Sequence, residues 1–391
     1  MPMSPDDMTP SAGSREATEM DSFDSPVVNR VRSSGGVWEL AGGQLLVPRV
    51  FGFCRGVRRA LVMLDQAVRA HRGKGQRLFL LGQIIHNPWV NTYFGGQGVQ
   101  ILSAGEVEHL EKFIAPADCA IIPAFGVPLP VERRLRAIGC EIIDTSCVDV
   151  RRLWTWAEQA VAQGYAVLIF GRAQHDETVV TKSRLADIGG KYLVVGNLGQ
   201  AELFADMILG QGPAAAFSEV FDAKATNADS LDPFIRLAQV SQTTMLYDET
   251  IELRDLLSRR FAQRFGGEAI EQHLLLQPTV CQATQARQAA GLELCRQGCD
   301  LVIVVGGFGS SNTRHLYEVA RRYCPAYFVE DADAILSAHE LQTIDLASSR
   351  PLTVKEYLPT RRPLRIGVLA GASTPEIVVG QVLEKLAMFL S

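Results

Sequence analysis

Three cysteines stand where an apolar, strand-like run gives way to a helix-like segment, and they limit what this chain can fold into. They are Cys54 in VFGFCRGVRRAL, Cys147 in IIDTSCVDVRRLW and Cys281 in LLLQPTVCQATQARQ. A thiol in the first turn of a helix lies at the positive end of the helix dipole, which lowers its pKa. Three such thiolates, if they converge, can hold an iron–sulfur cluster and leave one iron without a protein ligand. The alternative is that the cysteines are small core residues.

Short β-rich runs alternate with helical segments from Leu45 onward, a pattern typical of α/β units with mostly parallel sheets. The expected strands are 44–50, 77–81, 119–123, 141–143, 166–170, 192–195, 237–240, 301–305, 326–329 and 364–369. Helices are expected at 57–70, 150–163, 250–265 and 285–297. Cys54 and Cys147 also share the pattern C-x-x-V-R-R, which indicates a repeated unit.

The cysteine junctions begin comparable blocks and predict three similar α/β domains at residues 41–145, 146–278 and 279–391, the last with a C-terminal segment. A pseudo-threefold arrangement of these domains would bring the three thiols to one central point. Residues 1–40 are predicted to form a disordered extension, because most of them are rich in Ser, Asp, Met and Pro without a periodic apolar pattern. Residues near 210–232 are predicted to be a loop-rich insertion at the surface.

Composition and charge restrict the class of protein. A hydrophobic fraction of 47% and a charged fraction of 21% over 391 residues are ordinary for a soluble globular protein of two or three domains. The formal net charge of -5 argues against bulk binding to nucleic acid, and no apolar run is long enough to span a membrane. Because the acidic N-terminal stretch lacks an apolar signal core, we expect a cytoplasmic protein whose 8 Cys stay reduced.

Polar clusters follow several expected strands, at the sheet edge where open α/β sheets bind ligands. The clusters contain His86, His175 with Glu177, Thr243, Ser310 with Ser311 and Asn312, and Ser373. Each cluster alone is most often a helix cap or a structural group. Together, hydroxyls, an amide and two imidazoles suit a phosphate or diphosphate, and a carboxylate beside His and hydroxyl groups suits proton transfer.

The segments GFCRGV, IIHNP, DTSC, HDET, QTTML, CQATQ, GSSNT and GASTPE follow one another between Leu45 and the C-terminus. As an ordered set they resemble the 4-hydroxy-3-methylbut-2-enyl diphosphate reductase family, and IIHNP and QTTML are similar to its plant and cyanobacterial branch. The resemblance implies that Cys54, Cys147 and Cys281 bind a [4Fe–4S] cluster at the centre of the three domains, with one iron open to the substrate.

The resemblance also implies roles for the polar clusters. The positions that match those holding the substrate diphosphate are His86, His175, Ser310, Ser311, Asn312 and Ser373. Glu177 matches the acid that protonates the leaving hydroxyl, and Thr243 matches its partner in the proton relay. Two electrons from a ferredoxin- or flavodoxin-like donor would complete a reductive dehydroxylation to isopentenyl and dimethylallyl diphosphate, the last step of the non-mevalonate isoprenoid route.

The chain departs from the family's usual pattern at four positions near these motifs. Phe125 stands where many bacterial members have a His, and the plant and cyanobacterial branch has the same Phe. Val148 replaces the usual Pro after the second cysteine, and Gly309 replaces an Asn in the serine-rich segment. Arg55 puts a large cation beside the first cysteine, where it would raise the cluster potential, help to dock an electron donor or simply face solvent.

Two other classes of protein fit parts of this pattern. An aconitase-like hydro-lyase also uses three cysteines and an open iron, but it usually binds carboxylates through several arginines. A non-catalytic iron–sulfur sensor would not need Glu177 and Thr243. The His, Ser and Asn side chains of the expected anchor and the retained acid favour an enzyme that acts on a diphosphate.

Overall fold

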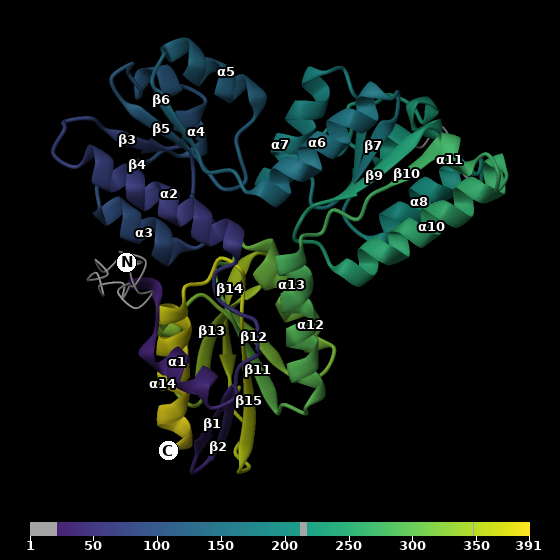
Figure 1. The fold of residues 1–391 in the computed structure, drawn as a ribbon. Coiled ribbons are helices and arrows are strands. Elements are labelled where there is room, and N and C mark those ends of the chain that lie inside the picture. Colours follow the sequence, from purple (N-terminus) through teal and green to yellow (C-terminus); the bar gives the residue numbers. More distant parts are fainter. Residues whose placement is uncertain (1–21, 212–216, 347) are drawn as a thin grey trace, which may run out of the picture.

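The computed structural model describes residues 22–211, 217–346 and 348–391. Three α/β units meet at the centre of the molecule, and each is built on its own mainly parallel sheet (Figure 1). The predicted α/β class is therefore confirmed. The helix that follows each of the three cysteines begins at this centre, so the meeting point of the units is also where the predicted site residues gather (Figure 1).

The first unit has a four-stranded parallel sheet in the order β4-β3-β5-β6. Its strands are β3 (Leu78–Leu80), β4 (Val99–Ile101), β5 (Cys119–Ile122) and β6 (Glu141–Asp144). Its helices are α2 (Arg55–His71), α3 (Pro88–Gly96), α4 (Ala104–Val107) and α5 (Leu129–Ile138). The amphipathic α2 buries Leu61, Leu64 and Val68 in the core of this unit. This packing holds the first turn of α2 at the centre of the molecule.

The second unit has the parallel order β10-β9-β7-β8. Its strands are β7 (Ala166–Phe170), β8 (Tyr192–Val195), β9 (Leu237–Ser241) and β10 (Leu274–Leu276). Its helices are α6 (Val148–Ala162), α7 (Asp176–Asp187), α8 (Leu198–Ile208), α9 (Phe217–Val220), α10 (Tyr247–Phe265) and α11 (Ile270–His273).

The described residues of the predicted surface insertion near 210–232 are mostly exposed, but two aromatic side chains depart from that prediction. Phe217 and Phe221 are buried and pack with the rings of Phe204 and Phe234 in the core of the second unit. Aromatic side chains gain enough from burial to draw an otherwise polar segment onto the unit. Residues 212–216 of that prediction lie outside the described residues.

The third unit has the sheet order β1-β2-β15-β11-β12, in which only the β1–β2 pair is antiparallel. Its strands are β1 (Val37–Leu40), β2 (Gly43–Leu46), β11 (Leu301–Val305), β12 (Ala326–Val329) and β15 (Leu364–Ala370), with a separate hairpin of β13 (Glu340–Asp345) and β14 (Arg350–Lys355). Its helices are α1 (Pro26–Ser33), α12 (Gln282–Arg296), α13 (Ser311–Arg321) and α14 (Glu376–Leu390). Thus β2, which the sequence assigned to the first domain, belongs to the third sheet, because pairing with β15 buries Leu45 and Leu46.

The chain before residue 40 is structured from residue 22, so the predicted disordered extension is wrong for residues 22–40. Helix α1 begins after Ser25, whose Oγ accepts the Val28 N–H at 3.3 Å, and Val28 and Val31 are buried in the core of the third unit. Phe23 is buried among aromatic rings, those of Phe53, Trp89, Tyr93 and Phe94. Helix α1 has only 8 residues, which are too few to show a clear helical periodicity of apolar residues in the sequence. Residues 1–21 lie outside the described residues.

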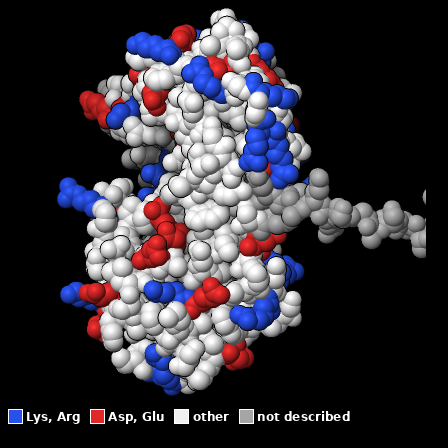
Figure 2. Space-filling model, turned by 90° about the vertical axis from the view of Figure 1, so that its left-hand side faces the viewer, with Lys and Arg blue, Asp and Glu red and all other residues white. Residues whose placement is uncertain are grey.

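Charged side chains of both signs are spread over the surface. On the face drawn in Figure 2, blue side chains gather along one edge of the upper part, whereas red and blue lie side by side over much of the lower part. Such mixing is typical of a solvated protein surface. Among the described residues, no helix combines the length and the apolar character needed to cross a lipid bilayer.

Candidate functional site

The three cysteines occupy the same structural position in their units, because each is the N-cap residue of a helix. Cys54 caps α2 and accepts the Val57 N–H at 3.3 Å, and Cys281 caps α12 and accepts the Thr284 N–H at 3.4 Å. Cys147 precedes α6 without a side-chain capping bond. All three line one cavity of about 120 Å³ at the centre of the molecule.

The first turn of α2 separates two of these thiols. A Cβ added at Gly56 would lie 2.6 Å from Cys147 Sγ and 3.8 Å from Cys54 Sγ, so only glycine leaves this space between the sulfur atoms open. Cys54 and Cys147 therefore belong to one site, although they come from different units.

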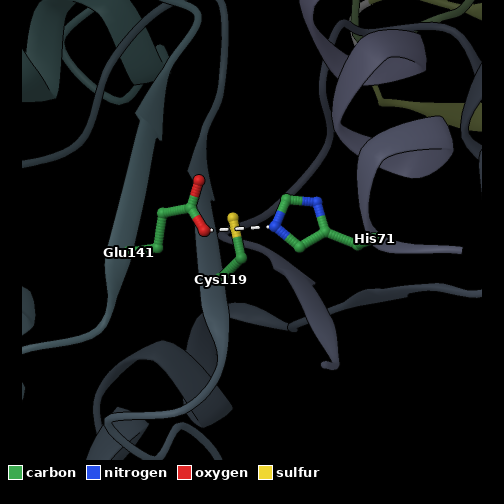
Figure 3. Close-up of side chains that lie close together, drawn as sticks. All are labelled: His71, Cys119 and Glu141. Carbon is green, nitrogen blue, oxygen red and sulfur yellow. Dashed lines mark hydrogen bonds and ion pairs between the residues drawn. The ribbon is translucent and has the colours of Figure 1, made fainter. Parts of the chain in front are cut away.

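The three cavity thiols do not all lie within 4.8 Å of one another. Among the described residues, the one group of three His, Cys, Asp or Glu ligand atoms within 4.8 Å of one another is His71, Cys119 and Glu141 (Figure 3). The cavity thiols form no such group, whereas sulfur ligands of one tetrahedral zinc ion lie about 3.8 Å apart. At least one pair of these thiols is therefore farther apart than two sulfur ligands of one zinc ion.

Burial raises the pKa of two of these thiols, whereas the sequence predicts a lowered pKa. It raises the pKa of Cys147 to about 11 and also raises the pKa of Cys281, although backbone N–H groups of the helix act to lower both. The prediction that the helix dipole lowers the thiol pKa is therefore wrong for these two cysteines, because the loss of water outweighs the dipole. Thiolates at this site need bound metal cations as compensation.

Glu177 and Thr243 form a buried pair in the same cavity. Glu177 lies in the first turn of α7 and is 3% exposed. Thr243 follows β9 and donates twice to the carboxylate, from its N–H to Oε1 at 2.6 Å and from Oγ1 to Oε2 at 2.6 Å. Burial raises the pKa of Glu177 to about 7, although both bonds from Thr243 lower it. A carboxyl group that titrates near neutrality is suited to proton transfer.

Two histidines stand beside this acid. His175 is the N-cap residue of α7, and its Nδ1 accepts the Glu177 N–H at 3.3 Å, so the neutral ring carries its proton on Nε2. Burial, with the neighbouring His86, lowers the pKa of His175 to about 3, which keeps it neutral at physiological pH. His86 pairs through Nε2 with Asp176 at 2.8 Å, and its ring stacks on Phe125 with centroids 4.7 Å apart.

Hydroxyl groups from two loops of the third unit meet in the same cavity, beside His86. Ser310 caps α13 by accepting the Thr313 N–H at 3.3 Å. Ser373, in the loop after β15, contacts Ser310 with the two Oγ atoms 3.3 Å apart. The two loops therefore present polar groups from the ends of neighbouring strands, as ligand sites of open α/β sheets do.

A buried hydroxyl in this cavity has no partner within the described residues. Ser311 is 2% exposed, and its Oγ makes no hydrogen bond. The adjacent Asn312 is held, because its Oδ1 accepts the Ala372 N–H at 3.0 Å and its Nδ2 donates to Thr284 Oγ1 at 3.4 Å. A buried polar atom without a partner costs free energy, which a ligand with oxygen acceptors would recover.

The cavity brings together every site residue that the sequence singled out. Its lining includes Cys54, Cys147, Cys281, His86, His175, Glu177, Thr243, Ser310, Ser311, Asn312 and Ser373. It also includes Asp149 and Thr284, which sequence reasoning missed. Both follow a cysteine in the first turn of a helix, and that position was the available signal.

A second cavity of about 730 Å³ lies on the outer side of the two histidines and shares them as lining residues. Its other residues include Arg172, Arg314 and Lys224. Burial and the nearby Arg172 lower the pKa of Arg314, and its buried Nε makes no hydrogen bond within the described residues. Three cations against the two carboxylates of this cavity, Asp176 and Asp222, leave a positive balance that attracts an anion toward His86 and His175.

The fold and the site define a three-unit α/β protein with a cavity lined by cysteine and hydroxyl groups. The model of the LytB protein family matches residues 45–387, and the chain belongs to this family. One similar relative is the 4-hydroxy-3-methylbut-2-enyl diphosphate reductase of Thermosynechococcus vestitus, which is 35% identical over 93% of this chain and 89% of the relative. Another is the enzyme of the same name from Cyanothece sp., which is 35% identical over 95% of this chain and 91% of the relative. The Gloeobacter violaceus relative with the same name is 34% identical over 93% of this chain and 87% of its own length.

Solved structures share the fold. That of (E)-4-hydroxy-3-methyl-but-2-enyl diphosphate reductase, described as the terminal enzyme of the non-mevalonate pathway, matches with a TM-score of 0.53 and 24% identity over 88% of this chain and 99% of that chain. The structure of the E-1-hydroxy-2-methyl-but-2-enyl-4-diphosphate reductase from Plasmodium falciparum matches with a TM-score of 0.61 and 20% identity, over 88% of this chain and 87% of that chain.

We predict that Glu177 titrates near pH 7 and that Thr243→Val raises this pKa further, because the substitution removes the hydroxyl that stabilises the carboxylate. The measurement is the carboxyl band in infrared spectra recorded against pH, assigned by its loss in Glu177→Gln. Thr181→Val is the matched control, since Thr181 Oγ1 donates to the Glu177 backbone carbonyl at 2.8 Å and not to the carboxylate. A Glu177 band that titrates near pH 4, as in water, would contradict the burial argument.

Proposed function

We propose that this protein catalyses the reductive dehydroxylation of 4-hydroxy-3-methylbut-2-enyl diphosphate to isopentenyl and dimethylallyl diphosphate, the last step of the non-mevalonate isoprenoid route. The observation that carries the proposal is the buried Glu177 carboxyl group, which Thr243 holds in the same cavity as the three thiols. The names of the cyanobacterial relatives support the same reaction.

Cys54, Cys147 and Cys281 would hold a [4Fe–4S] cluster in which one iron lacks a protein ligand. Their equivalent cap positions, their common cavity and the open space beside Gly56 support this assignment. When bound, the cluster supplies Lewis acidity toward the substrate hydroxyl and passes on electrons.

Glu177 would deliver a proton to the hydroxyl group that leaves as water. The overall conversion consumes two electrons and two protons and breaks one C–O bond. Because hydroxide is a poor leaving group, the step needs a proton donor at the oxygen, and a pKa of about 7 leaves a large fraction of Glu177 protonated at neutral pH. Thr243 fixes both carboxyl oxygens and so aims the proton into the cavity.

The hydroxyl and imidazole groups would bind the diphosphate. Ser311 offers a buried hydroxyl without a protein partner, and neutral His175 offers its Nε2–H. The other proposed contacts come from the same walls: His86, Ser310, Asn312 and Ser373. Anchoring the diphosphate fixes the carbon chain against Glu177, so binding energy is used for orientation. Arg172 and Arg314 in the outer cavity would draw the anion toward this anchor.

A ferredoxin- or flavodoxin-like protein would supply the electrons. An arginine surface surrounds the starts of α2 and α6, next to two of the three thiols, and consists of Arg55, Arg58, Arg59, Arg151 and Arg152. Arg151 and Arg152 pair with Asp144 and Asp149, so the unpaired charge of this surface comes from the side of α2. The guanidinium groups of Arg55 and Arg58 are exposed and make no ion pair or hydrogen bond within the described residues. Such a surface complements a small acidic redox protein and would shorten the path of the electrons to the site.

We also propose a cytoplasmic location. All eight cysteines are free thiols, which suits a reducing compartment. Free thiols are also the state in which three of them can serve as ligands of a cluster.

We expect Glu177→Gln to lower turnover by about 10²- to 10⁴-fold while the amount of bound iron and the cluster spectrum stay unchanged, because only the proton donor is lost. The assay is anaerobic reconstitution followed by measurement of both five-carbon diphosphate products. Glu158→Gln, which removes a surface carboxylate paired with Arg184, is the control. Turnover like that of the wild type would exclude the proton-donor role. An iron-loaded wild type that leaves this substrate unchanged would exclude the function.

Cys147→Ser should lose the cluster, because the substitution removes one of the three thiolate ligands and the two that remain cannot retain all the iron atoms. Iron and sulfide per chain and Mössbauer spectra measure the loss, with and without the substrate. Cys324→Ser, at a partly buried thiol outside the cavity, should keep the full cluster. A complete cluster in Cys147→Ser would remove the basis of the assignment.

Replacing Arg55 and Arg58 together by Glu should raise the KM for an acidic protein donor by about tenfold or more at low ionic strength, since attraction becomes repulsion. The effect should shrink with added salt. Turnover driven by dithionite, a small reductant that needs no docking, should stay unchanged. Arg259→Glu, on the exposed side of α10, is the control. Equal KM values in the double variant and the control would refute docking at the arginine surface.

A further inference from the structure

A second group of metal-ligating side chains lies at the far end of the first unit. Cys119 and Glu141 are register partners in the parallel strands β5 and β6, so their side chains leave the same face of the sheet. Helix α2 packs on this face, and its last residue is His71. Because α2 begins after Cys54, the group lies about 26 Å along the helix from that cysteine.

The contacts of His71 leave one ring nitrogen free for a cation. Its Nδ1 lies 2.7 Å from the Ala67 carbonyl, which can only accept, so Nδ1 carries a proton. Its Nε2 lies 3.1 Å from Glu141 Oε2 (Figure 3). A ring nitrogen and a carboxylate oxygen at this distance need a cation between them, either a second proton or a metal ion. Histidine ligands of metals characteristically donate their other N–H in this way.

Cys119 adds a sulfur donor to the group. Its Sγ, the His71 nitrogen and a Glu141 oxygen all lie within 4.8 Å of one another (Figure 3). Nitrogen, sulfur and carboxylate oxygen are together the donor set of zinc sites. The Glu141 side chain is 49% exposed, so solvent offers both a path for the ion and a water molecule as fourth ligand.

We propose that His71, Cys119 and Glu141 bind one zinc ion that fastens the end of α2 to the edge of the β5–β6 pair. Binding forms a Zn–S bond and releases the thiol proton to solvent, while His71 Nε2 contributes its lone pair and Glu141 its charge. The ion would stabilise the helix whose other end carries Cys54. This inference does not depend on the proposed reaction.

The test uses protein whose iron–sulfur cluster is already loaded, so that the central thiols are occupied. Zinc is added, excess is removed by gel filtration, and iron and zinc are measured in the same sample. We expect about one zinc per chain in the wild type and none in His71→Ala or Cys119→Ser. His339→Ala is the matched control, because His339 pairs with Glu356 at 3.0 Å in an exposed pair without a thiol.

The absorption spectrum of the bound zinc and the melting temperature of the protein provide two further tests of the proposal. Zinc K-edge absorption should detect one sulfur among nitrogen and oxygen neighbours, and zinc should raise the melting temperature of the wild type but not of Glu141→Gln. Glu141 is half exposed, so this variant remains informative if Cys119→Ser fails to fold. Two results would overturn the proposal: equal zinc binding in His71→Ala and the wild type, or no zinc in the wild type above the background of chelator-treated protein. Either result would mean that His71 and Glu141 form an ion pair next to a buried thiol.

Discussion

The centre of this protein depends on three backbone hydrogen bonds, each of which ties a cysteine to a loop at the end of a strand. The Cys54 N–H donates to the Ala372 carbonyl at 3.2 Å, that of Cys147 to Ala124 at 2.7 Å and that of Cys281 to Thr243 at 3.0 Å. Because a buried N–H without a partner is costly, these bonds fix where each helix begins. The first joins the start of α2 to the third unit, so the cavity forms only when the units are packed together.

Burial favours the uncharged form of three ionisable groups on the cavity wall. The same loss of water raises the pKa of Cys147 and of Glu177 and lowers that of His175. A protonated acid and the neutral imidazole of His175 suit the proposed reaction, in which a hydroxyl must leave and a diphosphate must be held. The thiols are different, because they become good ligands only when metal cations repay the cost of their charge.

The departures from the family's usual pattern lie where the structure tolerates them. Phe125 stacks on His86, so it fixes the plane of the imidazole that it adjoins. A Cβ at Gly309 would lie 3.6 Å from the His86 ring, an ordinary contact, so an asparagine there would meet no steric barrier. Val148 is 54% exposed, and Arg55 is exposed on the arginine surface. None of these four residues takes part in the two hydrogen bonds between Thr243 and Glu177.

The sequence alone determined the α/β class, most of the strands and most of the polar side chains that line the cavity. These features are local: apolar runs, helix starts and short motifs can be read within a few residues. The short edge strands β1 and β4 and the polar hairpin of β13 and β14 escaped this reading, because they carry little apolar periodicity. Only the tertiary structure decided that β2 joins the third sheet, that Phe217 enters the core and that Thr243 donates to Glu177 from its backbone N–H as well as its hydroxyl. It also reversed the expected acidity of Cys147, because burial depends on the packing of all three units and no short segment encodes it.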